Sequence, residues 1–194
     1  MKYLQTYENY LILEIGEIKL PPYEIDNQLD IPILGVHAKN YFFSTDSGLR
    51  YSINIMEEIP PIFISEEDIE ENNFIEENPV EFYKKTIAIS FFVFDGEDEE
   101  AYYTYDDTVI TNRGELFRIM STLKDVILQY LDENPHVKYI FAGGQRGEKV
   151  IDKEQRDRIY LTYFKKNKPE WDSSYIHCQI KDEKYPIIKI KWNI

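Results

Sequence analysis

The sequence predicts an α+β protein in which one mainly antiparallel, twisted sheet packs against two helices. Three observations support this fold class. Residues 113–133 repeat apolar side chains at helical spacing, and residues 87–94 form the strongest β-type apolar run. The elements are ordered as strands, a long helix, a strand, a second helix and two final strands. A chain of 194 residues can bury one sizeable core, so we expect a single domain over 1–194.

The first half of the chain is predicted to be rich in strands. Residues 3–20 alternate loosely in β-favouring company, and the two adjacent prolines that follow end the run. The stretch YFFSTDSGLRYSINIM (41–56) predicts a β-hairpin, since TDSG supplies the turn residues. The run at 86–95 is almost continuously apolar, which predicts a strand buried on both faces.

The long helix is predicted at about 113–133. Its apolar stripe consists of Leu116, Ile119, Met120, Leu123, Val126, Ile127, Tyr130 and Leu131. We expect Asn112 to cap this helix, with Glu115 three residues on as the reciprocal partner.

The C-terminal third alternates between strand and helix signals. A short strand is predicted at 137–142, a second helix at about 153–166, and two strands within 175–180 and 185–194. The strand–helix–strand order around 105–142 predicts one parallel pair of strands.

Charge is large and unevenly distributed. The formal net charge of −14 argues against nucleic-acid binding and against docking on an anionic membrane. An acidic excursion at about 57–82, which we expect to be ordered with a short helix, has no lysine or arginine up to residue 81. It is either a solvated segment or a surface that meets a basic protein partner or mimics nucleic acid. The partner-binding candidates are Glu66, Glu67, Asp68, Glu70 and Glu71.

A glycine-rich loop is the main candidate for a ligand site. Residues 141–150 match neither the Walker phosphate loop nor the dinucleotide fingerprint, because the required hydroxyl and glycine spacing are missing. Glycine amides, a following helix N-terminus and nearby cations could still hold an anion. The alternative is that the glycines only form a turn and the arginines pair with neighbouring carboxylates. The candidates for anion binding, including the start of the long helix, are Arg113, Gly114, Gly143, Gly144, Arg146, Gly147, Lys149 and Arg156.

Other specific sites are not indicated. Cys178 is the single cysteine and the three histidines are scattered, so we expect no metal site and no disulfide. No apolar run approaches the ~18 residues of a transmembrane helix, and the first residues do not read as a signal peptide. We therefore expect a cytoplasmic protein, which includes the host-cell cytoplasm or a virion if a phage encodes it.

Two resemblances involve the second half of the chain. IMSTL (119–123), FAGG (141–144) and QRDRIY (155–160) resemble a spaced pattern of small bacterial and phage proteins, a loose group with no established activity, over about 110–165. This resemblance implies a phage or mobile-element origin. Because no specific active site is indicated and carboxylates are clustered, we predict a non-catalytic acidic binding protein without a cofactor, whose partner is a virion or assembly component or a host-defence factor.

The strand–helix–strand–helix order is also similar to the second half of the GNAT acetyltransferases. That resemblance implies an alternative function, acyl transfer from acetyl-CoA, with Tyr160 in its Ile159–Tyr160 step as the general acid. The family's pyrophosphate loop reads Arg/Gln-x-x-Gly-x-Gly/Ala, and over 109–114 only Gly114 agrees with it.

Overall fold

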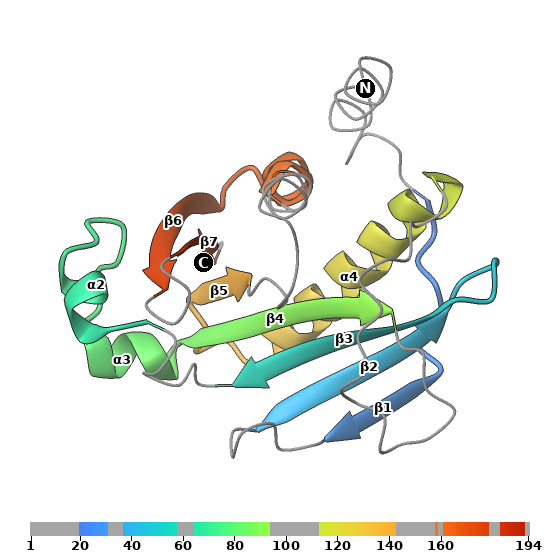
Figure 1. Cartoon of the computed structure of the whole chain (residues 1–194), viewed down its shortest axis with the longest axis horizontal. Helices are drawn as coiled ribbons and strands as arrows, with labels where there is room; N and C mark the ends of the chain where they lie inside the picture. The colour runs from blue at the N-terminus through green and yellow to red at the C-terminus, as the bar shows by residue number, and fades with distance from the viewer. Residues whose placement is uncertain are drawn as a thin grey trace.

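The computed structural model describes residues 20–30, 37–57, 64–93, 113–142, 158, 161–178 and 183–192. Within them, seven strands form one sheet in the order β1-β2-β3-β4-β5-β7-β6 (Figure 1). Every neighbouring pair is antiparallel except β4 and β5, which are parallel. This arrangement confirms the predicted α+β class and the mainly antiparallel sheet. The strands are β1 (Asn27–Asp30), β2 (Ala38–Ser44), β3 (Arg50–Glu57), β4 (Thr86–Val93), β5 (Tyr139–Ala142), β6 (Asp172–Cys178) and β7 (Glu183–Lys189).

The helices lie on both sides of this sheet. The two short helices α2 (Glu66–Glu70) and α3 (Pro79–Lys84) gather at one end of it, and the long helix α4 (Arg113–Glu133) crosses one face (Figure 1). The bounds of α4 confirm the helix predicted at 113–133. Residues 158 and 161–167 are also helical, as the prediction for 153–166 requires, while the rest of that segment lies outside the described residues.

The predicted hairpin is confirmed as β2 and β3. Its turn closes with the Thr45 amide donating to the Leu49 carbonyl at 2.8 Å and the Gly48 amide donating to the Thr45 carbonyl at 2.9 Å. Gly48 has φ +85°, a left-handed conformation that glycine adopts without the steric cost of a Cβ. The strand expected within 3–20 lies outside the described residues, and β1 is a strand that the sequence patterns did not predict.

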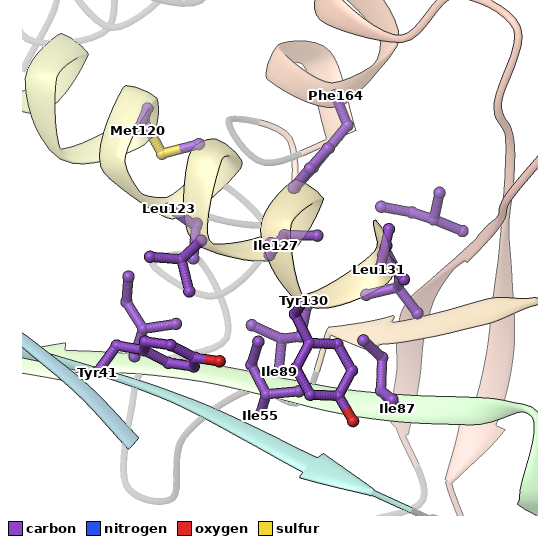
Figure 2. Packing of buried hydrophobic residues seen from close by; sticks show 14 of the residues in the cluster. Tyr41, Ile55, Ile87, Ile89, Met120, Leu123, Ile127, Tyr130, Leu131 and Phe164 are labelled. Atoms are coloured by element: carbon purple, nitrogen blue, oxygen red, sulfur yellow. The ribbon is translucent and has the colours of Figure 1, made fainter. Parts of the chain in front are cut away.

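The main core lies between α4 and one face of the sheet. Leu123 and Tyr130 project from α4 towards side chains of the central strands (Figure 2). Met120, Ile127 and Leu131 of α4 belong to the same buried cluster. All of the predicted stripe is buried except Leu116, which packs half-buried against the cluster. The parallel pair of strands consists of β4, which precedes α4, and β5, which follows it. Residues 101–112, which also precede α4, lie outside the described part of the chain.

A second apolar cluster lies on the opposite face of the same sheet. Because side chains alternate along a strand, Ile140 of β5 faces α4, whereas Tyr139 and Phe141 face away from it. These two aromatic residues are covered by the segment that carries α2 and α3, which contributes Ile64, Ile69, Phe74, Ile75, Phe82 and Tyr83. The acidic excursion is therefore ordered where the structure describes it, and it has two short helices rather than one.

Proline 186 decides how the end of the sheet is built. The Ile190 amide donates to the Lys138 carbonyl of the chain leading into β5, so the backbone of alternate β7 residues, including Pro186, faces β5. Pro186 has no N–H to donate to β5. The pairing between β5 and β7 accordingly stops at Phe141 and Ile187 and does not include Pro186. Tyr175 of β6 is the partner of Pro186, so by the same alternation its backbone groups point outward, to the edge of the sheet.

Candidate functional site: the acidic helix α2 and its mounting

Helix α2 is specified locally by a cap and a single apolar anchor. The Ser65 hydroxyl accepts a hydrogen bond from the Asp68 amide at 3.0 Å and donates one to Asp68 Oδ2 at 2.5 Å. Carboxylates in the first turn are favoured by the partial positive charge of a helix N-terminus. Ile69, which is 1% exposed, points into the second apolar cluster and fixes the side of the helix that faces the protein.

Four of the five predicted partner-binding carboxylates are exposed to solvent. Asp68 differs from the others because its side chain is partly buried, caps the helix through Ser65 and lies 3.4 Å from Nδ1 of His177 on β6. Asp68 therefore helps to hold α2 in place on the sheet. We call the remaining four residues the acidic surface: Glu66, Glu67, Glu70 and Glu71.

Two features of the acidic surface are unfavourable to the helix that carries it, although Glu66 and Glu67 in the first turn are favoured by the helix N-terminus. Glu66 with Glu70 and Glu67 with Glu71 are like-charge pairs at i,i+4 spacing, which destabilise a helix. Glu70 and Glu71 also lie at the end of α2 where the helix dipole disfavours negative charge, and the last turn has no basic residue. Within the described residues, none of the four makes an ion pair.

The carboxylates that follow α2 are, by contrast, paired with lysines. Glu76 reaches Lys189 of β7 at 2.7 Å, and Glu77 reaches Lys138 at 2.6 Å. In α3, Glu81 pairs with Lys85 at 2.9 Å and with Lys84 at 3.9 Å. The acidic excursion therefore has two parts. In one part, the carboxylates form ion pairs with lysines and hold the segment on the sheet. The other part is the acidic surface, which forms no ion pair with described residues.

Glu77 makes the most contacts among these paired carboxylates. One carboxylate oxygen accepts from Lys138, and the other accepts from the hydroxyl of the buried Tyr139, which itself accepts from the Glu76 amide at 3.2 Å. Burial alone would raise the pKa of Glu77, but the hydrogen bonds from Lys138 and Tyr139 outweigh it and lower that pKa. Hydrogen bonding and the charge of Glu77 raise the pKa of Lys138, while burial, followed by the contact with Glu77, raises that of Tyr139.

The start of α4 is the other predicted site that the structure describes. Arg113 and Gly114 form its first two positions. The expected cap by Asn112 with Glu115 lies outside the described residues, because Asn112 is not among them. The buried Glu115 carboxylate accepts from the Ser47 amide at 2.7 Å and from the Ser47 hydroxyl at 2.8 Å. The first turn of α4 therefore carries a negative charge, which opposes binding of a second anion there.

The next turn of α4 is fixed by an arginine. Arg118 donates to Asp46 at 2.7 Å and to the Pro21 carbonyl at 3.1 Å, and its guanidinium lies 3.8 Å from the centre of the Tyr23 ring. The Tyr23 amide donates to the Thr122 hydroxyl at 2.8 Å. These contacts tie the chain before β1 and the hairpin turn to α4.

The remaining predicted site residues lie outside the described part of the chain. They are Gly143, Gly144, Arg146, Gly147, Lys149, Arg156 and Tyr160. Their grouping into an anion site, and the role of Tyr160 as a general acid, therefore stay predictions.

Sequence reasoning also missed residues that the structure brings to α2 and α4. Asn72 donates from Nδ2 to the Tyr175 carbonyl at 3.4 Å across 103 positions, and Ser47 binds Glu115 across 68. Patterns of neighbouring residues in the sequence predict neither contact, because the partners are far apart along the chain. The capping sequence from Ser65 to Asp68 could have been found, because serine followed three residues later by an acidic residue marks a helix start.

Comparisons with other proteins add no relative: no family model, curated protein or solved structure matches this chain. Among the described residues, no group of three or more histidine, cysteine, aspartate and glutamate side chains could hold a metal ion. In the same ranges, no helix combines the length and the apolar character that a bilayer crossing needs.

Proposed function

We propose that this protein is a non-catalytic binding protein whose acidic surface meets a basic surface of a protein partner. The observation that carries the proposal is the contrast within one short segment. Glu76, Glu77 and Glu81 are neutralised by lysines, whereas the acidic surface is exposed and has no ion pair among the described residues. A partner's lysines or arginines would supply the missing opposite charge.

The destabilisation of α2 by carboxylates of the acidic surface supports the same proposal. Sequences tend to break local rules at functional positions, because selection for the function outweighs the local free energy. Like charges at i,i+4 spacing and carboxylates at a helix C-terminus are two such violations in one five-residue helix. The apolar anchor Ile69 and the contacts of Asp68 and Asn72 hold this surface in one orientation.

Reversing the acidic surface should abolish partner binding. A tagged protein carrying Glu→Lys changes at the four positions is expected to recover at least tenfold less partner from native lysate than the wild type at low salt, where exposed charges interact most strongly. Asp68 is left unchanged because it caps α2. The complex is first identified by size-exclusion chromatography of the lysate.

The matched control is an equal charge reversal elsewhere. The exposed residues Glu24, Asp30, Asp125 and Asp132 lie outside α2, before or in β1 and in α4, and receive the same lysine substitutions. This control separates a specific surface from a general effect of net charge. Undiminished recovery by the acidic-surface variant at low salt would contradict the proposal, and equal loss in both variants would reduce it to a net-charge effect.

The rival proposal, a GNAT-like acyltransferase, makes a different prediction for ligand binding. We expect millimolar acetyl-CoA, ATP and NAD each to leave the melting temperature unchanged. A cofactor present at a hundredfold its dissociation constant would add about 2.7 kcal/mol of stability and raise the melting temperature visibly. A rise with acetyl-CoA alone, abolished by Arg113→Ala or Arg146→Ala, would favour the acyltransferase.

A nucleic-acid mimic would use the same carboxylates on a different partner. In that case the partner recovered from lysate binds DNA or RNA, and added nucleic acid competes with this protein for it. The charge-reversal experiment is therefore repeated with competing duplex DNA.

A further inference from the structure

Charged and aromatic side chains gather on the α4 side of the sheet, at the edge formed by β1. The Tyr41 ring of β2 belongs to the main core, and Lys39, two residues before it, lies on the same side with its Nζ 3.8 Å from Glu133 Oε2 of α4. Asp30 is the partner of Lys39 in the β1–β2 register, so their side chains emerge on the same face.

The end of β3 completes this group. Glu57 Oε1 accepts from the buried Tyr130 hydroxyl at 2.7 Å. Figure 2 shows the hydroxyl end of Tyr41 turned towards Tyr130. We call the six residues the edge site: Asp30, Lys39, Tyr41, Glu57, Tyr130 and Glu133.

The Tyr41 hydroxyl is the feature of the edge site that points to a ligand. Tyr41 is only 5% exposed, yet in the part of the chain that the structure describes its hydroxyl has no hydrogen-bond partner. Burial, followed by the charges of Glu133, Asp30 and Glu57, raises the pKa of this hydroxyl to about 12. A buried polar group without a partner costs free energy, which a ligand that bonds to it would recover.

The edge site also has more negative than positive charge. Three carboxylates face one lysine, which leaves a formal charge of −2, and 3.8 Å is long for a charge-assisted hydrogen bond between Lys39 and Glu133. Within the described ranges Asp30 makes no ion pair, and the Glu57 carboxylate accepts from Tyr130 alone. A ligand that fits must therefore bring positive charge and several hydrogen-bond donors.

A guanidinium group meets both requirements, because it stays charged and carries five N–H donors in one plane. The rim of the edge site is open to solvent, since Asp30 is exposed and the Glu133 side chain is 53% exposed. Small-molecule sites enclose most of their ligand, so an open site fits the end of a side chain that a larger molecule carries. We propose that the edge site binds an arginine side chain of a protein partner.

This contact is separate from the acidic surface and goes beyond the proposed function. Helix α2 lies against β6, through Asn72 and Tyr175, whereas the edge site lies at β1. These are the two opposite edges of a seven-stranded sheet, and strands about 4.8 Å apart place them roughly 30 Å from each other.

An NMR titration of the isolated protein with N-acetylarginine amide tests the site, because this probe carries one guanidinium and no other charge. We expect saturable chemical-shift changes at the amides of Asp30, Lys39 and Glu133. N-acetylcitrulline amide, a neutral analogue of the same shape, should leave these amides unshifted. No saturable change with the arginine probe, or equal changes with the citrulline probe, would overturn the proposal.

Two variants assign the binding to the edge site. Tyr41→Phe keeps the ring and should weaken binding of the arginine probe about two- to tenfold, the range for one neutral hydrogen bond. Asp30→Asn with Glu133→Gln should weaken it about threefold or more, through the loss of two partly exposed ion pairs. Unchanged affinity in both variants would contradict the proposal.

Glu70→Gln with Glu71→Gln is the matched control, since it removes the same amount of charge from the acidic surface. Its affinity for the arginine probe should equal that of the wild type. Equal weakening in this control and in the double variant of the edge site would mean that net charge attracts the probe, and the proposal would fail. No partner takes part in the titration, so its result is independent of whether the acidic surface binds one.

Discussion

Replacing Phe82 by alanine should lower the free energy of unfolding by about 3–5 kcal/mol, the usual cost of deleting a buried aromatic ring. Phe82 is fully buried at the centre of the second apolar cluster. Its ring centre lies 5.2 Å from that of Tyr139 and 6.0 Å from that of Tyr83. The substitution leaves a cavity between α3 and the sheet, and urea denaturation followed by fluorescence measures the loss.

Val80→Ala is the control in the same helix. Val80 is 58% exposed and belongs to neither apolar cluster, so its truncation should change stability by less than about 0.5 kcal/mol. A Phe82→Ala variant as stable as Val80→Ala would show that α3 does not pack on the sheet as described. Since α2 and α3 share one apolar cluster, we also expect Phe82→Ala to increase hydrogen exchange in α2.

Replacing Glu77 by glutamine should cost about 2 kcal/mol at neutral pH, within the range for hydrogen bonds to a charged group. The Glu77 side chain is only 8% exposed, and the substitution removes the charge that meets Lys138 and that strengthens the hydrogen bond from the Tyr139 hydroxyl. Lys138 can turn to solvent, but Tyr139 is fully buried and is left with the neutral amide oxygen of glutamine as its acceptor beside the contact with the Glu76 amide. Equilibrium denaturation at pH 7 measures the difference.

The pH dependence of this difference follows from the lowered pKa of Glu77. A carboxylate whose pKa is depressed on folding contributes stability above its unfolded-state pKa, and this contribution is lost as pH falls through the folded-state value. The gap between wild type and Glu77→Gln should therefore be full at pH 6 and 7 and close as pH falls below about 4. A gap that stays constant down to pH 2 would contradict the role assigned to the charge.

Glu76→Gln is the matched control for Glu77. The two residues are adjacent and each pairs with a lysine, but the Glu76 side chain is 73% exposed. Exposed ion pairs contribute about 0–1 kcal/mol, so Glu76→Gln should be nearly neutral and more so in high salt. Equal losses in the two variants would mean that burial does not distinguish the two carboxylates.

The regular elements were determined largely by the sequence alone. The stripe of α4, the apolar run of β4 and the turn chemistry around Gly48 each depend on periodicity or backbone preference within a few residues, and each element formed where these patterns predicted it. The short strand β1 was missed because four largely exposed residues carry no hydrophobic periodicity, and pairing with β2 defines it.

The acidic excursion shows what only the tertiary structure decided. Its composition made all the carboxylates look alike, yet folding separates Glu77, which is buried against Tyr139 from 62 positions away, from the exposed Glu70 and Glu71. Asp68 was likewise grouped with a binding surface and turned out to hold α2 against His177. The physical reason is that a carboxylate's role depends on whether a lysine, a hydroxyl or water surrounds it. That environment is created by strands brought together from distant parts of the chain, which local sequence patterns do not encode.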